Sequence, residues 1–319
     1  MTFDLLTVGE AMIRLSVPAG DLLMEAPAYD VNVAGAESNV AVAVARMGFR
    51  SRWLSRLTDN VLGRRIVSVL NSYGVDCSQV EWTAEDRVGT YFLEFGSTPR
   101  PTQVTYDRKY SAASKMGPQT FDLAQVAEAR ILHLTGITAA ISDSCYAMLE
   151  QLIDMARTQG IHIVFDVNFR RLLWTPQTCE AKLSPLLTKV NTLLLSRQDA
   201  ETVFNVKGEP EQMLQAFRDR FGMAQIAITT GAEGAVGLAN GVMVTAPGYP
   251  VHIVDRIGAG DAFAAGVICG LLSGDFASGM RYGVAMSALQ LSLKGDLFRL
   301  GRAEVEQLMN TGIASRPIR

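Results

Sequence analysis

DRIGAGDAFAAGVICGLLSG, residues 255–274, is the stretch that says most about the fold and chemistry of this chain. Gly258, Ala259 and Gly260 carry little or no side chain, so their backbone N–H groups can approach a ligand closely. The apolar run after them predicts a helix whose N-terminus points at the same place. Because unpaired amides and the positive end of a helix dipole both attract negative charge, the stretch predicts an anion hole suited to phosphate.

Asp261 follows these small residues and is expected at the mouth of the anion hole. A carboxylate there repels phosphate, which indicates a chemical role: it accepts the proton of a hydroxyl that attacks a phosphoryl group. The alternative is a helix cap beside a tight turn. Two other nucleotide motifs are excluded, because a GxGxxG fingerprint needs glycine where Phe263 stands and no GxxxxGK[ST] loop occurs in the chain.

From about residue 120 onward, short β-rich runs alternate with amphipathic helical runs. Strands are expected at residues 130–135, 161–166, 191–195 and 225–229. Between the first two, a helix is predicted with Asp143 capping its first turn and Gly160 ending it in a left-handed conformation. This alternation is typical of βαβ crossovers. We therefore predict an α/β fold with a doubly wound, mainly parallel sheet covered by helices on both faces.

The N-terminal third has a predicted strand at 5–9 and helices at about 38–47 and 62–73, but two segments interrupt the alternation. Residues 12–34 and 88–112 both predict β structure without helix. Two such segments without partners of their own most simply pair with each other, as a small β-sheet lid that projects from the main domain. The predicted organisation is a nucleotide-binding α/β core of residues 1–11, 35–87 and 113–319 and a lid of residues 12–34 and 88–112.

Composition narrows the function classes. The 319 residues are 48% hydrophobic and carry a formal net charge of −3 without any basic run, which argues against nucleic acid as a partner. No window is long and apolar enough for a membrane span, and the first residues lack the features of a secretory signal. The four cysteines lie far apart with no CxxC pair, which argues against disulfides and zinc. We expect reduced thiols and a cytoplasmic location.

GAGDAF near the C-terminus and AGAESNVAVAVARMG near the N-terminus together resemble the ribokinase-like (PfkB) family of carbohydrate kinases. The resemblance spans nearly the whole chain, and the order of motifs agrees: the N-terminal GxxxN helix, a central DxNxR, TTGAEGA and then GAGD. It implies a ribokinase-like fold, ATP as phosphoryl donor together with Mg²⁺, and Asp261 as catalytic base beside Gly258, Ala259 and Gly260. No protein-only metal site is predicted.

Two further stretches, VTYDRKYSAAS (104–114) and DVNFRRLLW (166–174), resemble the members of the family that phosphorylate the sugar acid 2-keto-3-deoxygluconate at its 6-hydroxyl. A substrate carboxylate favours guanidinium groups, whose fork can bind both oxygens. The substrate contacts implied by the resemblance are Gly35, Asn39, Tyr91, Tyr106, Arg108, Arg170, Asp261 and Asp296. Alternatives stay open: packing or solvated roles for the lid residues, an exposed turn at Asp296, a kinase of a neutral sugar such as fructose or ribose, or a non-catalytic nucleotide-binding regulator.

For the nucleotide, the resemblance implies contacts from the ends of core strands and from the loop TTGAEGA, although turn glycines alone would also explain that loop. The implied residues are Asn168, Ser196, Thr229, Thr230, Gly231, Gly234, Gly258 and Gly260. Ser196 and Asp199 stand where the family has NxxE, with a shorter reach toward Mg²⁺ and phosphate. Ile257 lacks the hydroxyl that the family often has there, so no monovalent cation is predicted near Asp255. Exposed apolar faces of the lid predict a homodimer through the lids, with a higher homo-oligomer as the alternative.

Overall fold

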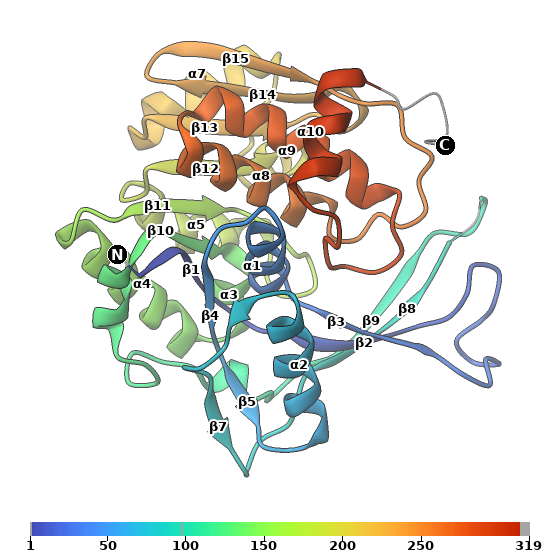
Figure 1. Ribbon diagram of the computed structural model, residues 1–319. Coiled ribbons are helices and arrows are strands. Elements are labelled where there is room, and N and C mark those ends of the chain that lie inside the picture. Colours follow the sequence, from blue (N-terminus) through green and yellow to red (C-terminus); the bar gives the residue numbers. More distant parts are fainter. Residues whose placement is uncertain (1, 97, 313–319) are drawn as a thin grey trace.

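The computed structural model describes residues 2–96 and 98–312 and shows a large central sheet between helices, with a small sheet extending from one side (Figure 1). Within these residues, nine strands form the large sheet in the order β15-β14-β13-β12-β11-β10-β1-β4-β6. All neighbouring strands from β13 to β6 are parallel, while β14 and β15 add an antiparallel edge. The predicted doubly wound, mainly parallel α/β sheet is confirmed.

The predicted core strands lie within two residues of their observed bounds. The large sheet contains β1 (Phe3–Val8), β4 (Ser51–Leu54), β6 (Val75–Asp76), β10 (Ala129–Thr135), β11 (His162–Asp166), β12 (Thr192–Ser196), β13 (Gln225–Thr229), β14 (Gly234–Ala239) and β15 (Val242–Pro247). Along β12, Leu193 and Leu195 pack into one hydrophobic cluster and Leu194 into another. Because side chains alternate across a strand, the apolar run of β12 reflects burial on both faces.

Two layers of helices cover the sheet. One layer contains α1 (Ala36–Arg46), α8 (Ala259–Ser273), α9 (Phe276–Leu291) and α10 (Arg302–Thr311). The other contains α3 (Gly136–Ile141), α4 (Asp143–Thr158), α5 (Pro176–Leu187), α6 (Arg197–Val203) and α7 (Pro210–Phe221). Helix α2 (Val61–Ser72) packs beside β6, where Ile66 and Leu70 contact a third cluster. The layer with α1 and α8 brings the two motif-bearing helices together.

The lid is a sheet in the order β3-β2-β8-β9. Its strands are β2 (Met12–Ser16), β3 (Asp30–Ala34), β8 (Thr90–Glu94) and β9 (Gln103–Asp107). Strands β2 and β8 pair in parallel, with Ile13 opposite Thr90, so the two β segments of the N-terminal third do pair with each other. A further small sheet joins β5 (Arg56–Thr58) and β7 (Glu81–Thr83).

One predicted cap is wrong. Ser142, and not Asp143, caps α4, because its hydroxyl accepts the Cys145 N–H at 3.1 Å while Asp143 is already the first helical residue. The short helix α3 before it was not predicted. Gly160 has the expected positive φ, at +68°. All four cysteines are buried and free, and none of the described helices is long and apolar enough to cross a bilayer.

Candidate active site

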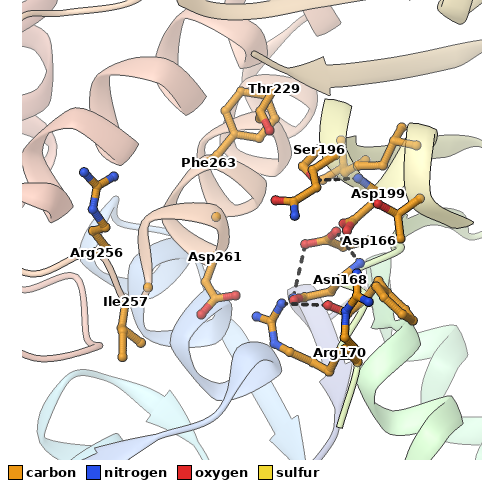
Figure 2. A pocket seen from close by; sticks show the side chains of 18 of the residues that line it. Asp166, Asn168, Arg170, Ser196, Asp199, Thr229, Arg256, Ile257, Asp261 and Phe263 are labelled. Carbon is orange, nitrogen blue, oxygen red and sulfur yellow. Dashed lines mark hydrogen bonds between the residues drawn. The ribbon is translucent and has the colours of Figure 1, made fainter. Parts of the chain in front are cut away.

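Helix α8 begins at the carboxyl ends of the core strands, where open α/β sheets place their ligands. A cavity of about 640 Å³ lies there. Asp166 ends β11, Asn168 lies just after it, Ser196 ends β12 and Thr229 ends β13. All four line this large cavity together with the start of α8 (Figure 2). The sheet edge therefore brings the central motif and the GAGD motif to one place.

The first residues of α8 lie at the large cavity, where the sequence predicts the anion hole. Gly258 has φ +84°, and a Cβ on it would come within 2.4 Å of the Asp296 carbonyl oxygen, so only glycine fits. Gly260 lies in the first helical turn, and a Cβ there would meet no described atom within 4 Å. The space beside Gly260 is therefore open. Gly258 and Gly260 line the large cavity, whereas Ala259 is not among the described lining residues.

Asp261 is almost fully buried, with 9% exposure, at the end of this space. Its Oδ2 accepts a hydrogen bond of 2.7 Å from Nδ2 of Asn39, on α1. Burial raises the pKa of Asp261 to about 6, while the hydrogen bond from Asn39 and the charge of Arg170 oppose that rise. The carboxylate is therefore mainly ionised at neutral pH but basic enough to accept a proton.

A smaller cavity of about 70 Å³ lies between the lid and the core. All eight residues predicted to contact substrate line it: Gly35, Asn39, Tyr91, Tyr106, Arg108, Arg170, Asp261 and Asp296. Tyr106, Arg170 and Asp261 line the large cavity as well. Figure 2 shows the side chains of Asp261 and Arg170 pointing into the same space. The structure thus places an acid and an arginine where the two cavities meet.

Several of these side chains already have partners. Arg108 forms an ion pair with the buried Glu10, donating from Nε at 2.8 Å, so its guanidinium is not free. Asp296 is only 3% exposed and accepts the Tyr91 hydroxyl at 2.7 Å, so the alternative of an exposed turn residue is wrong. Gly35 also has a packing role, because a Cβ on it would lie 2.2 Å from the Glu10 carbonyl oxygen. Direct contact of these residues with substrate stays a prediction.

The residues predicted for the nucleotide divide into two groups. Asn168, Ser196, Thr229, Gly258 and Gly260 line the large cavity. Thr230, Gly231 and Gly234 are not among its described lining residues. They form the turn between β13 and β14, where the Thr230 N–H donates to the Gly234 carbonyl at 2.9 Å and Gly234 adopts φ +108°. The turn accounts for these glycines, and their contact with nucleotide stays a prediction.

Comparison with known families matches residues 2–299 to the pfkB family carbohydrate kinases. The chain belongs to this family. This PfkB kinase is 35% identical to the 2-dehydro-3-deoxygalactonokinase of Haloferax volcanii, over 98% of its own length and 99% of the relative's. It superposes with a TM-score of 0.92 on 2-dehydro-3-deoxygluconokinase from Thermotoga maritima, at 29% identity, covering 97% of this chain and 99% of the other.

The same fold occurs in an Escherichia coli chain described as a ribokinase II, which was solved in complex with ATP and Mg²⁺. That chain is 20% identical to this one and superposes with a TM-score of 0.88, covering 97% of this chain and 99% of the other. The predicted family, the ribokinase-like fold and the enzyme class are confirmed. The protein is a carbohydrate kinase and therefore a phosphotransferase.

Two further carboxylates lie at the PfkB kinase site: Asp166, which was not predicted as a site residue, and Asp199, which was noted only for its short reach toward Mg²⁺ and phosphate. Asp166 and Asp199 line the large cavity with Asp261. Burial raises the pKa of Asp166 well above its ordinary value, and the charges of Asp261 and Asp199 add to that rise. Burial also raises the pKa of Asp199, against the charge of Arg170. Asp166 is the first residue of the DVNFRR stretch and the last residue of β11, and a carboxylate at the carboxyl end of a core strand could have been recognised in the sequence as a candidate site residue.

Two buried groups near the kinase site have structural explanations. Glu37, on α1, accepts hydrogen bonds of 2.6 Å from the hydroxyls of Thr135 and Thr138, and burial raises its pKa to about 6. His133 lies within the sheet, 3.1 Å from the Thr7 hydroxyl, and burial lowers its pKa to about 3. His133 is therefore neutral and belongs to the core, and neither Glu37 nor His133 lines the large or the smaller cavity.

Proposed function

We propose that this kinase transfers the γ-phosphoryl group of ATP to a hydroxyl of a sugar acid, the 6-hydroxyl of 2-keto-3-deoxygluconate (also named 2-dehydro-3-deoxygluconate). The observation that carries the proposal is the position of Arg170 and Asp261 at the boundary of both cavities. A base there can reach a hydroxyl from one side and face a phosphoryl group on the other. A guanidinium there offers two parallel donors to a carboxylate. The names of the relatives support the same substrate class.

In the proposed reaction, ATP occupies the large cavity with its phosphates at the start of α8, and the sugar acid occupies the smaller one. Asp261 takes the hydroxyl proton as the new O–P bond forms and the bond to the β-phosphate oxygen breaks, which releases ADP. The amides of residues 258–260 and the dipole of α8 stabilise the phosphate charge. Closure of the lid over the sugar excludes water, which would otherwise compete as acceptor.

Magnesium fits the residues around the large cavity. Asp166, Asp199 and Asp261 place three carboxylates where the triphosphate of ATP is expected. A divalent cation between the carboxylates and the phosphates would offset the repulsion between these negative charges. Asp166 and Asp199 offer the hard oxygen donors that Mg²⁺ prefers. Within the described residues, no group of three or more His, Cys, Asp or Glu side chains could hold a metal without help. Asp166 and Asp199 would thus hold the ion together with phosphate oxygens and water, and bound Mg²⁺ would neutralise phosphate charge.

The enzyme is further proposed to form a homodimer through its lids. The segment that includes β3 and the loop before it exposes large apolar side chains, among them Met24 at 97% and Val31 at 42%. Leu22 and Tyr29 are each 40% exposed nearby. Clustered apolar side chains on a projecting sheet are a common interface between copies of a chain.

The substrate proposal is tested by ADP release with a panel of sugars: 2-keto-3-deoxygluconate, its galactonate epimer, fructose and ribose, with and without Mg²⁺. Arg170→Leu should raise KM for the sugar acid by about 10- to 100-fold, because it removes charge-assisted hydrogen bonds to the carboxylate. Arg171→Leu is the matched control, since Arg171 lines only the large cavity. A wild-type enzyme with higher kcat/KM for fructose or ribose, or equal effects of both substitutions on KM for the acid, contradicts the proposal.

A further inference from the structure

A buried cluster of charges joins the lid to the loops around the anion hole. Arg14 comes from the lid strand β2, and its side chain is fully buried. Its Nη2 donates to Asp255 Oδ2 and its Nη1 to Asp296 Oδ2, each at 2.7 Å. Both carboxylates are buried as well, with residue exposures of 2% and 3%. Because a buried charge is costly unless paired and hydrogen-bonded, the two aspartates depend on Arg14.

The two aspartates hold the backbone that shapes the anion hole. Asp255 also accepts the Ile257 N–H at 3.0 Å and the Gly295 N–H at 3.2 Å, so it ties the residues before α8 to the turn at 295–296. The backbone of Asp296 packs directly on Gly258, where the Cβ that glycine lacks would be 2.4 Å from its carbonyl oxygen. The spacing between Asp255 and Asp296 therefore sets the position of Gly258.

The same cluster reaches the sugar cavity. Tyr91, on β8, is the register partner of Arg14 on β2, and its hydroxyl donates to the second oxygen of Asp296 at 2.7 Å. Tyr91 and Asp296 both line the smaller cavity. One arginine thus connects the strands of the lid, the wall of the sugar cavity and the loop of the anion hole.

We propose that Arg14 is a positioning residue for phosphoryl transfer. Its guanidinium holds Asp255 and Asp296 together, so that the amides at the start of α8 stay where the phosphates need them. It also halves the charge of two carboxylates that would otherwise repel those phosphates from behind the hole. Arg14 acts through the aspartates and does not line either of the two cavities described above. The inference rests on the kinase reaction proposed above.

The test is the turnover of Arg14→Met, measured with the sugar that the wild type uses best, in sodium buffer with and without added guanidinium or potassium chloride. We expect kcat to fall by about 10- to 100-fold, the usual cost of removing a residue that orients a site through others. A small cation that enters between the two carboxylates should restore part of the lost kcat, about fivefold or more at millimolar concentration. A role in folding alone would give no such rescue.

Arg56→Met is the matched control. Arg56 is also largely buried and pairs with Asp86 at 2.7 Å, but it lines neither cavity. The Arg56→Met variant should be less stable than the wild type but keep its kcat, and the added cations should not change its rate. Unchanged kcat in Arg14→Met, or a loss that neither cation reverses, overturns the proposal.

If Arg14→Met does not fold, Arg14→Lys answers the question, because a lysine ammonium tethered to the backbone does not place two donors at the positions of Nη1 and Nη2, which bind different aspartates. Its kcat should be about tenfold lower than that of the wild type, and equal kcat overturns the proposal. Failure of the substrate proposal is separately visible. If the wild type prefers a neutral sugar, the assigned substrate is wrong, while the Arg14 variants are still compared on that sugar.

Discussion

Asp261→Asn removes the proposed base while keeping its size. The amide oxygen can still accept the hydrogen bond from Asn39, so the geometry at the start of α8 is retained. Loss of a positioned general base costs about 10²- to 10⁴-fold in rate, and we expect kcat to fall within that range. Binding of ATP should change little, because the amides of the anion hole remain.

The pKa of Asp261 makes the prediction sharper. With a pKa of about 6, the carboxylate of the free enzyme is about 97% ionised at pH 7.5 and half ionised near pH 6. The wild-type kcat/KM should therefore fall as pH drops through about 6, since the protonated acid cannot accept a proton. The residual rate of Asp261→Asn should lack this acidic limb.

Stability should change in the opposite direction from activity. Burial moves the pKa of Asp261 from its ordinary 3.8 to about 6, so ionised Asp261 destabilises the folded state above pH 6, by up to roughly 3 kcal/mol. This cost disappears as pH falls below about 4, where the group is protonated in both states. Asp261→Asn removes the buried charge and should raise the free energy of unfolding at pH 7.5, with a smaller gain near pH 4.

The assays are coupled ADP release between pH 5 and 8.5, nucleotide binding by calorimetry, and urea unfolding at pH 4 and 7.5. Asn39→Ala is a useful comparison, because it removes the hydrogen bond to Asp261 and should shift the acidic limb to higher pH. Near-normal turnover of Asp261→Asn, or an acidic limb that persists in it, would refute the reasoning.

Two further substitutions test the anion hole and the lid. Gly260→Val should raise KM for ATP about tenfold or more with little loss of stability, because its side chain enters open space. Gly258→Ala should instead lose at least about 1 kcal/mol of stability, because φ is +84° at that position. Similar nucleotide affinity in wild type and Gly260→Val would contradict the anion hole. For the lid, sedimentation of the wild type should show a dimer, and Met24→Glu combined with Val31→Lys should give monomers, since both side chains are exposed and apolar. A wild type that sediments only as a monomer at working concentration would contradict the lid interface.

Most of the substrate side of the site was predictable from sequence. The eight residues assigned to it by motif all line one cavity. Gly35, Asn39, Arg170 and Asp261 lie at the ends of core strands or the starts of helices, which meet at one edge of the sheet, and the lid carries Tyr91, Tyr106 and Arg108 to the same place. The prediction of the nucleotide-binding side of the site was less complete. Thr230, Gly231 and Gly234 follow a core strand, but a tight turn carries them back into β14. Asp166 was overlooked although it ends a core strand, and Asp199, in the first turn of α6, was noted only for its short reach.

By itself the sequence determined the alternation of strands and helices, the lid segments and the glycine turn at the start of α8, because each depends on residues close together in the chain. Only the tertiary structure decided which charges meet. Arg14 pairs with Asp255, which is 241 positions away in the chain, and with Asp296, which is 282 positions away. Arg108 pairs with Glu10, which is 98 positions away. Local periodicity carries no information about such pairs, since they form only when the lid and the core pack together and exclude water from the charges between them.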